Sequence, residues 1–348
     1  MTAAGISTCS ANSGQVLAIA FRNMGVALHE GRASMTGLLD DFGHAVISGL
    51  EQAKRIIPAR FFYDHRGSEL FEEITSLPEY YLTRTERGLL SAHAKDIARL
   101  TGMGHVVVEF GSGSSAKTPI LLNALRPTAY LPIDISADFL GMSANSIAVA
   151  HPDIRVVSLA GDFTRPLALP EEFCGPFIGF FPGSTIGNFA PRSAVDLLRS
   201  FRTTLGDEST LVIGIDTRKD PRLLEAAYDD AAGITADFNL NLLHRINRDL
   251  GGTIRVEYFK HRIFWDGGLG RIEMHLEATE DTDFDVAGRK FSMRKGETIH
   301  TENSYKYTPD EARILARSAG WDPITVWTDP DAMFGLHVWR AAPQQLEP

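Results

Sequence analysis

Cysteine and recognisable metal-binding motifs are scarce in this sequence. Only two cysteines, Cys9 and Cys174, occur in 348 residues, on unrelated segments. Two cysteines are too few for a disulfide framework and offer no spacing of metal ligands. The histidines are scattered, without an HExxH or paired-histidine motif, so we expect no metal. These absences predict inert thiols in a reducing, cytoplasmic setting.

Long apolar runs are also missing. Near the N-terminus, the apolar stretches 16–20 and 24–28 are separated by Arg22 and Asn23. No stretch reaches the roughly 18 residues that cross a bilayer, and no basic region precedes them, as a secretory signal requires. We expect residues 1–34 to form a disordered extension upstream of a candidate start at Met35. A docked amphipathic helix is the alternative.

Basic charge is in deficit. The chain carries 34 Lys and Arg against 44 Asp and Glu, a net charge of −10, and no basic run occurs. Binding to nucleic acid depends on neutralising phosphates with Lys and Arg, so we expect neither a nucleic-acid nor a membrane partner. The content of 44% hydrophobic and 22% charged residues is ordinary for a globular protein, and the length allows one large or two smaller domains.

Short apolar runs alternate with helical patterns over residues 105–215. The runs His105–Glu109 and Ala129–Asp134 each end in an acid, and their length and flanking residues favour buried parallel strands. Such alternation predicts a doubly wound α/β sheet with helices on both faces. Further strands are predicted at 154–157, 176–181 and 210–215, and helices at 116–124, 137–150 and 194–205.

The flanking segments have a different character. Residues 61–87 are dense in aromatic and polar side chains, which predicts a loop-like binding surface. Residues after 216 suggest a smaller inserted domain, and the tail returns to helix and paired strands. Helices are predicted at 36–53, 69–76, 85–100, 220–249 and 309–318, strands at 253–266, 270–279, 324–328 and 335–341, and a hairpin at 284–298.

A Gly-rich turn follows the first strand of the alternating region. Gly111 and Gly113 let the main chain approach a ligand without a Cβ collision, and the turn places backbone N–H groups at the carboxyl edge of a parallel sheet. Ala116 replaces the third glycine of the GxGxxG fingerprint, which disfavours a nicotinamide cofactor. By itself this turn is a weak signal.

Three further features lie at the same sheet edge. Asp134 ends the second strand, where an acid accepts hydrogen bonds from ribose hydroxyls. Asp162 beside Phe163 suits an adenine amino group and ring face, and residues 181–188 close the fourth strand. Both acids could instead be helix N-caps. Four features in the correct order favour a nucleoside cofactor.

Five segments carry a resemblance to a known family: Phe62–Phe71, Leu77–Glu86, Glu109–Lys117, Pro182–Phe189 and His300–Ser304. With these segments the chain resembles the S-adenosylmethionine-dependent histidine Nα-methyltransferases of ergothioneine biosynthesis, from about Met35 to the end. This resemblance implies a Rossmann-like class I methyltransferase fold, α/β, with a second, smaller α+β substrate domain. It implies a methyltransferase domain of residues 86–218 and 307–348, and a substrate domain of 35–85 and 219–306.

The same resemblance implies functions for individual residues. S-adenosylmethionine is the implied cofactor and L-histidine the substrate, methylated three times on its α-amine to give hercynine. Asn188 and Tyr81 are the implied catalytic residues. The implied cofactor contacts are Gly111, Lys117, Asp134, Asp162 and Phe163. The implied histidine contacts are Tyr81, Asn188, Tyr228, Glu302 and Ser304.

The residue types suit this chemistry. Methyl transfer to an amine is an in-line displacement, so the enzyme mainly positions and desolvates its reactants. We expect Asn188 to hold the amine, Tyr81 and Tyr228 to bind the carboxylate, and Glu302 with Ser304, i and i+2 on one strand face, to bind the imidazole nitrogens. No strong base is evident, so proton loss to water before each round is our hypothesis.

Structural interpretations remain open for several of these residues. Tyr80 or Tyr81 could be a core aromatic, Asn188 a turn residue, and Glu302 a surface partner of Lys306. Lys117 could be a solvated charge. We expect Tyr63, Asp64 and Arg66 to shape a lid over the substrate.

Other functions compete with histidine methylation. An N-methyltransferase for another amino acid, such as a tryptophan or tyrosine derivative, is disfavoured because an indole or phenol gives the Glu302 carboxylate a poorer partner. A non-catalytic nucleotide-binding module is a further alternative, and a nicotinamide oxidoreductase is the least favoured. We expect a monomer.

Overall fold

The structure is a computed structural model that describes residues 40–343 except residue 136. The chain divides into two compact units, Met1–Asp40 and Asp41–Pro348, and the described helices and strands all lie in the second. The predicted extension 1–34 lies outside the described residues. Among the described residues, no helix has both the length and the apolar character to span a membrane.

The larger sheet has the strand order β13-β14-β7-β6-β2-β3-β4, with β5 also paired to β3. The strands from β7 to β4 run parallel, and β14 is antiparallel to both β7 and β13. Strands β2 and β6 are buried along their whole length, as expected for parallel strands covered on both faces. The bounds are β2 Val106–Phe110, β3 Ala129–Asp134, β4 Arg155–Val156, β5 Leu159–Ala160, β6 Phe177–Phe181, β7 Thr210–Asp216, β13 Trp321–Thr328 and β14 Phe334–Ala341.

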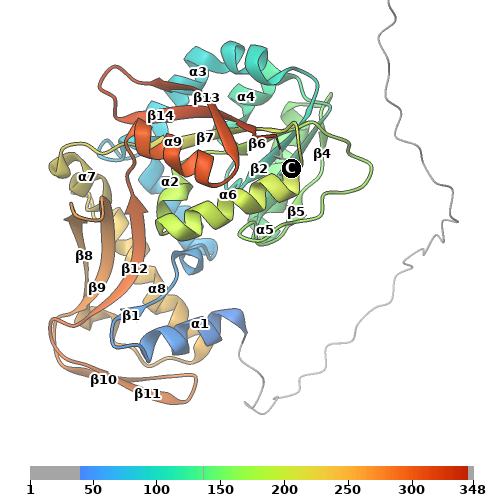
Figure 1. Ribbon diagram of the computed structural model, residues 1–348. Helices are drawn as coiled ribbons and strands as arrows, with labels where there is room; N and C mark the ends of the chain where they lie inside the picture. The colour runs from blue at the N-terminus through green and yellow to red at the C-terminus, as the bar shows by residue number, and fades with distance from the viewer. Residues whose placement is uncertain (1–39, 136, 344–348) are drawn as a thin grey trace, which may run out of the picture. The chain divides into compact units, whose positions relative to one another are not determined.

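Helices cover both faces of this sheet (Figure 1). Val106 and Val108 of β2 share one buried core with Phe201 of α6. On the opposite face, the Glu109 side chain bonds to Thr118 of α4, because successive strand residues point to opposite faces. The predicted doubly wound α/β architecture is therefore confirmed. The helices are α3 Tyr81–Thr101, α4 Thr118–Leu125, α5 Ala137–Ala150, α6 Pro191–Leu205 and α9 Pro309–Ser318, with the short 3-10 helix η2 Thr185–Asn188 after β6.

A second, smaller sheet has the order β1-β12-β9-β8, and β10 and β11 form a separate hairpin. Helix α8 packs on β8 and β9, and α2 packs on α8. Both sheets belong to one compact unit, so the division into two domains stays a prediction. The bounds are α1 Asp41–Leu50, β1 Arg55–Ile56, η1 Ala59–Phe62, α2 His65–Thr75, α7 Pro221–Tyr228, α8 Ile234–Leu250, η3 Val256–Tyr258, β8 Phe259–Asp266, β9 Arg271–Ala278, β10 Thr282–Val286, β11 Arg289–Met293 and β12 Thr298–Tyr305.

The prediction of a loop over residues 61–87 was wrong. The segment is mostly helical, and α3 begins at Tyr81, four residues before the predicted start at Thr85. Buried Leu82 and Glu86 lie on one side of the helix, and the buried carboxylate hides the apolar spacing that sequence patterns rely on.

The predicted helix 220–249 is in fact two helices, α7 and α8. Gly233, with φ +77°, separates them. The Asp230 carboxylate accepts hydrogen bonds from the backbone N–H groups of Ile234 and Thr235 at 3.0 and 2.8 Å, which satisfies the first turn of α8. The predicted strand 253–266 is likewise shorter and begins at Phe259.

Candidate cofactor and substrate site

The Gly-rich turn joins β2 to α4 at the carboxyl edge of the larger sheet. Gly111 and Gly113 have φ of +69° and +49°, a region that favours glycine. A Cβ at Gly111 would lie 3.3 Å from the Phe163 ring, and the Gly113 N–H donates to Asp134 Oδ2 at 3.0 Å. The structure thus brings Gly111, Asp134 and Phe163 together, in a cradle that a larger residue at 111 would narrow.

Asp162 lies beside Phe163 but has a local partner. Its Oδ1 accepts hydrogen bonds from the backbone N–H and the hydroxyl of Thr164 at 2.9 and 2.6 Å. This arrangement is an Asx turn, close to the capping function considered as an alternative. The position of Asp162 at the same edge is as predicted, while a contact with adenine stays a prediction.

The buried acid Glu109, in β2, stabilises the Gly-rich turn that follows the strand. Glu109 is 1% exposed, and its Oε2 accepts hydrogen bonds from the hydroxyls of Tyr130 and Thr118. Ser115 in the turn bonds to the same Tyr130 hydroxyl at 3.1 Å. Burial raises the pKa of Glu109 to about 7. This network ties the end of β2 to β3 and α4, and only the acid itself was visible in the sequence.

Lys117 is not a solvated charge. Its ammonium forms an ion pair with Glu86 of α3, and the two side chains are 16% and 0% exposed. Glu86 also accepts from the backbone N–H of Gly183, at 3.0 and 2.9 Å from its two oxygens. The pair therefore clamps the Gly-rich turn to α3 and to the loop after β6. Sequence analysis quoted Glu86 only as the end of a motif.

Asn188 ends η2, where the larger sheet meets β12. A Cβ at Gly187 would lie 2.7 Å from the Tyr305 carbonyl oxygen and 3.4 Å from Ser304 Oγ, so η2 packs closely on β12. Asn188 itself is half-buried, and among the described residues its side-chain amide has no hydrogen-bond partner. The predicted neighbours Asn188 and Ser304 are thus brought together from distant segments.

Glu302 lies just after a β-bulge in β12. The register shifts between His300 and Glu302, so that His300 is opposite His275 of β9 while Glu302 is opposite Met274. A bulge turns a side chain toward a different face. Glu302 and Ser304 consequently share the face of the smaller sheet that lies toward α7, as predicted from their spacing, and His300 points to the other face.

The Glu302 carboxylate is half-buried and, within the described part of the chain, has neither an ion pair nor a side-chain hydrogen bond. The proposed surface pair with Lys306 is wrong, because Lys306 is fully buried and pairs with Asp216 at 2.7 Å. Burial raises the pKa of Glu302 to about 7, although the charge of Lys306 opposes this shift. An unpaired acid in such surroundings suits a ligand that donates a hydrogen bond.

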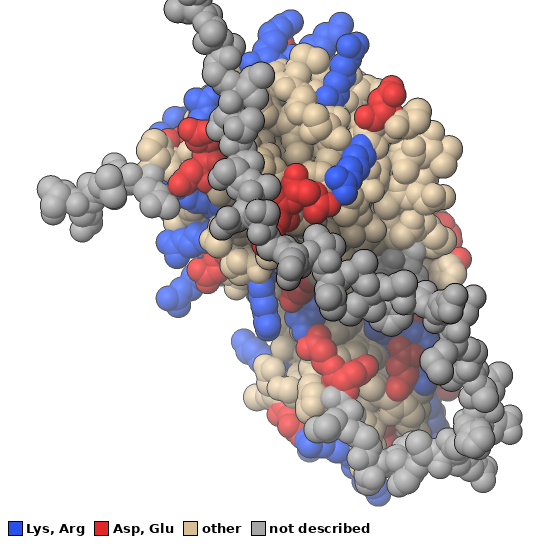
Figure 2. All heavy atoms as spheres, turned by 90° about the vertical axis from the view of Figure 1, so that its right-hand side faces the viewer, with Lys and Arg blue, Asp and Glu red and all other residues tan. Residues whose placement is uncertain are grey.

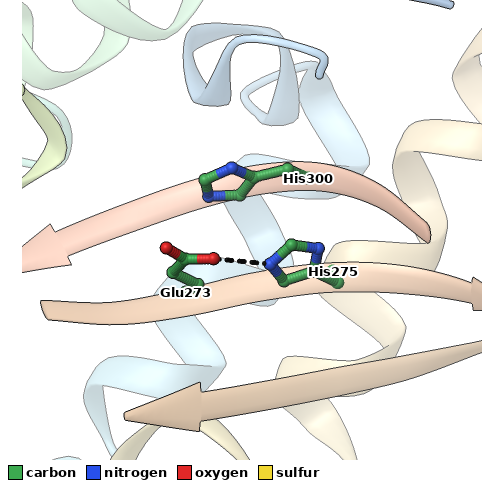
Figure 3. A group of neighbouring side chains, drawn as sticks. All are labelled: Glu273, His275 and His300. Carbon is green, nitrogen blue, oxygen red and sulfur yellow. Dashed lines mark hydrogen bonds and ion pairs between the residues drawn. The ribbon is translucent and has the colours of Figure 1, made fainter. Parts of the chain in front are cut away.

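On the opposite face of the smaller sheet, Glu273, His275 and His300 gather with their donor atoms within 4.8 Å (Figure 3). His275 Nε2 lies 2.9 Å from Glu273 Oε2, and His300 Nε2 donates to the Glu302 carbonyl oxygen at 3.0 Å. The two imidazole rings stack at 4.5 Å with an angle of 11°. These nitrogens already have protein partners, so the group secures the bulge that directs Glu302.

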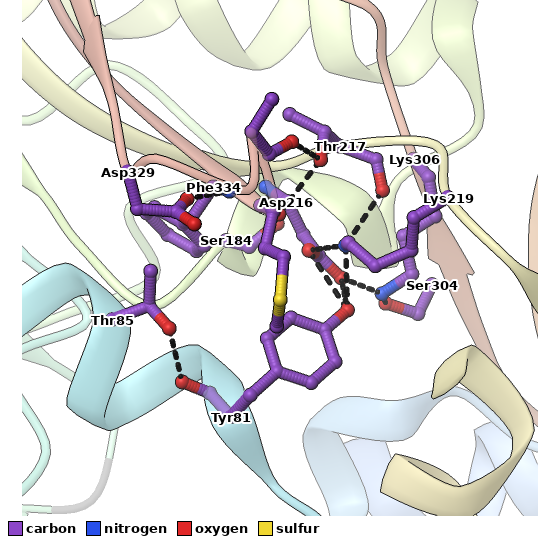
Figure 4. A network of polar contacts seen from close by, with 12 residues as sticks. Tyr81, Thr85, Ser184, Asp216, Thr217, Lys219, Ser304, Lys306, Asp329 and Phe334 are labelled. Carbon is purple, nitrogen blue, oxygen red and sulfur yellow. Dashed lines mark hydrogen bonds and ion pairs between the residues drawn. The ribbon is translucent and has the colours of Figure 1, made fainter.

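Tyr81 lies inside a buried network (Figure 4). Its hydroxyl donates to the Asp216 carboxylate, at 2.8 and 3.0 Å from the two oxygens, and accepts from Lys219 Nζ at 2.7 Å. Tyr81 is 2% exposed. Tyr81 is therefore a buried core residue, as the structural interpretation has it, and its hydroxyl donates to Asp216.

Tyr228 and Ser304 form a hydroxyl pair at 2.6 Å. Burial, followed by the charges of Asp216 and Glu302, raises the pKa of Tyr228 well above its usual value, so its hydroxyl stays protonated. The predicted histidine contacts Tyr228, Glu302 and Ser304 thus lie in one group.

Two tyrosines that sequence analysis did not place at a ligand border the same site. Burial and then the charge of Glu302 raise the pKa of Tyr63, and Asp134 also raises it. Tyr63 is therefore near enough to both Asp134 and Glu302 for their charges to act on its hydroxyl. The ring of Tyr80 lies 6.3 Å from that of Tyr228. The dense aromatic segment was the available signal, but it did not indicate which rings face inward.

The chain is similar to known proteins over most of its length. A family model described as histidine-specific methyltransferase, SAM-dependent, matches residues 42–341. A histidine N-alpha-methyltransferase of Mycolicibacterium smegmatis is 37% identical over 298 residues, covering 84% of this chain and 92% of that protein. One from Mycobacterium tuberculosis is 36% identical over 309 residues, 85% and 95% of the two chains. Ergothioneine biosynthesis protein 1 of Neurospora crassa is 32% identical over 294 residues, 82% of this chain and 33% of that protein.

Proposed function

The chain belongs to the SAM-dependent histidine-specific methyltransferases, and from this premise we propose which of its residues bind the reactants and how they act. The enzyme methylates the α-amine of L-histidine, a step of ergothioneine biosynthesis. We propose that three rounds give the betaine hercynine. The observation that carries the assignment of the substrate site is the unpaired carboxylate of Glu302 on the same strand face as Ser304.

The cofactor binds at the Gly-rich turn. Gly111 leaves space beside the Phe163 ring, Asp134 is suited to ribose hydroxyls, and Asp162 with Phe163 is suited to adenine. S-adenosylmethionine supplies an electrophilic methyl group on its sulfonium. Lys117 contributes indirectly, because its ion pair with Glu86 fixes the turn.

The substrate lies between Asn188, which follows a strand of the larger sheet, and Glu302 on the smaller sheet. The Asn188 amide oxygen accepts a hydrogen bond from the α-amine and directs its lone pair. Glu302 accepts the N–H of the imidazole ring. Because Tyr228 is hydrogen-bonded to Ser304, we assign the Tyr228–Ser304 pair to the other ring nitrogen, and not Tyr228 to the carboxylate as expected from the sequence. Tyr63 and Tyr80 form the aromatic walls.

The reaction needs positioning more than acid–base catalysis. Each round forms an N–C bond, breaks the S–C bond and releases one proton and S-adenosylhomocysteine. Burial keeps the Tyr63 hydroxyl neutral, so Tyr63 does not act as the base, and the amine loses its proton to water before each round. Tyr81 acts through Asp216 and not by contact with the substrate.

Mass spectrometry of histidine incubated with the enzyme and S-adenosylmethionine tests this proposal. We expect products heavier by one, two and finally three methyl groups. Glu302→Ala should reduce kcat/KM for histidine by at least a hundredfold, whereas Glu257→Gln, a change at an exposed acid, should leave it unchanged. Full turnover of histidine by the Glu302→Ala variant would reject the assigned site.

We also propose the coarse organisation predicted from sequence: two domains, and a monomer that works in the cytoplasm without a nucleic-acid or membrane partner. Figure 2 shows one face of the molecule on which basic and acidic side chains are interspersed, which supports the absence of a polyanion partner. Sedimentation equilibrium of the full chain should give the mass of one chain. A stable dimer would contradict the proposal.

A further inference from the structure

Lys306 is a fully buried cation that the reaction as described above does not use. Its side chain is 0% exposed, and its ammonium lies 2.7 Å from Asp216 Oδ2, 2.8 Å from Ser304 Oγ and 3.0 Å from the Tyr228 hydroxyl. It also lies 4.7 Å from the centre of the Tyr228 ring. A buried charge is retained only where its partners are in place, so Lys306, Asp216 and the two hydroxyls form one unit.

The number of hydrogens determines which group donates and which accepts in each hydrogen bond of this unit. A lysine ammonium has three donors and no acceptor, and its three neighbours use all three. Each hydroxyl therefore accepts from Lys306, and the 2.6 Å contact between Tyr228 and Ser304 uses the hydrogen of one of them. One hydroxyl hydrogen is left over. The pair can present this hydrogen to a ligand, because neither hydroxyl has a further acceptor among the residues that the structure describes.

Asp216 holds Lys306 in this position. It is fully buried at the end of β7 and binds Tyr81, Lys219 and Lys306 (Figure 4). Its backbone N–H donates to Ser184 Oγ at 2.9 Å. The carboxylate is thus fixed from α3, β7 and β12, and the ammonium of Lys306 cannot turn away without leaving a buried charge unpaired.

We propose that Lys306 is a positioning residue that makes the Tyr228–Ser304 pair a hydrogen-bond donor, opposite the acceptor Glu302. The site then offers one donor and one acceptor, which matches the neutral imidazole ring, with one N–H and one lone pair. The imidazolium ion, with two N–H groups and no lone pair, leaves the remaining hydroxyl hydrogen without a partner. This inference rests on the proposed function, since it assigns the pair to the imidazole of histidine.

The test measures histidine binding to the complex with S-adenosylhomocysteine by calorimetry, together with steady-state kinetics. Lys306→Met should raise the KM for histidine at least tenfold, with kcat within about threefold and the affinity for S-adenosylhomocysteine unchanged. In a Ser304→Ala/Tyr228→Phe background, Lys306→Met should have little further effect, because Lys306 acts through the hydroxyls. A full additional loss in that background, or an unchanged KM in the single variant, would overturn the inference.

A second variant guards against misfolding. Asp216→Asn/Lys306→Met removes the carboxylate and the ammonium together, and retained binding of S-adenosylhomocysteine shows that it folds. Its histidine affinity should be as weak as that of the Ser304→Ala/Tyr228→Phe variant, and wild-type affinity would overturn the inference. If the wild-type complex binds no histidine, the proposed function fails. If it binds histidine and the variants bind equally well, only the assignment of Lys306 fails.

Discussion

A carboxylate without a cation of its own makes Glu302 the most informative single residue. Its folded-state pKa is about 7 against an ordinary value of 4.5, so the folded protein holds this proton more tightly than the unfolded chain. Between pH 4.5 and 7 the unfolded state loses the proton first, and the contribution of Glu302 to the free energy of unfolding falls as pH rises.

Glu302→Gln should therefore stabilise the protein more at pH 7.5 than at pH 5. We expect a difference of about 1 to 3 kcal/mol, since one pKa unit corresponds to about 1.4 kcal/mol and the side chain is partly exposed. Urea unfolding at the two pH values measures it. Equal effects of the substitution at both values would contradict the raised pKa.

The Gly-rich turn gives a second prediction at this scale. Gly111→Ala places a methyl group against Phe163 in a backbone region that costs an L-residue about 1 to 2 kcal/mol. We expect the affinity for S-adenosylhomocysteine to fall about tenfold or more, measured by calorimetry.

Gly104→Ala is the matched control for this prediction. Gly104 also has positive φ, of +77°, but no atom lies within 4 Å of its Cβ position. It should lose similar stability and retain cofactor affinity. If both variants bind equally well, the turn does not contact the cofactor.

The sequence predicted which candidate residues share a face or an edge of a sheet, such as Glu302 and Ser304, but not their contacts. Glu302, Ser304 and Asn188 lie where their spacing and motifs predicted. The adjacent tyrosines at 80 and 81 could not be told apart, because α3 begins between them. Tyr81 turns into the core while Tyr80 lies near Tyr228. The direction of a side chain at a helix start depends on packing that a local pattern does not contain.

At the scale of the element, the bulge in β12 is fixed from the face opposite Glu302. His300 donates to the Glu302 carbonyl oxygen and stacks on His275. His300→Phe preserves an aromatic ring for stacking and removes the donor.

We expect His300→Phe to raise the KM for histidine about threefold to tenfold, because Glu302 loses a constraint on its backbone. The KM for S-adenosylmethionine should not change. Steady-state kinetics with each substrate varied in turn make the comparison, and an unchanged KM for histidine would show that the bulge holds without His300.

Elements were predicted well where burial is simple and poorly where polar groups are buried. The runs at β3 and β6 are apolar and sandwiched between helices, and their spans were close to those predicted. The start of α3 and the break between α7 and α8 were missed. In both places a buried carboxylate hides the expected pattern. Glu86 occupies a position where an apolar residue is usual and binds the distant Gly183 N–H. Asp230 accepts from the Thr235 N–H in the first turn of α8.

At the scale of the molecule, the two sheets share buried contacts. The ion pair of Asp216 with Lys306 joins β7 to the residue after β12, and η2 packs on β12. Alternating strands and helices predicted the larger sheet, but pairing partners of distant strands are set by contacts that no sequence window contains.

These shared contacts predict a single cooperative unfolding transition for residues 41–348. Near-ultraviolet and far-ultraviolet circular dichroism should give the same urea midpoint. In Asp216→Asn the buried lysines lose their carboxylate, and the midpoint should fall. Two separated transitions in the wild-type protein would show that the sheets unfold independently.

The register of β12 also makes the site sensitive to an insertion between Glu302 and Ser304. His300 and Glu302 are two residues apart but lie on opposite faces of β12, so Thr301 is an added residue in the strand. Loss of Thr301 would restore a regular strand with Glu302 and Ser304 still on the substrate side. Gain of one residue between Glu302 and Asn303 would turn either the acid or the hydroxyl to the wrong face. The number of residues between Glu302 and Ser304 therefore decides the arrangement of these two side chains together with their identity.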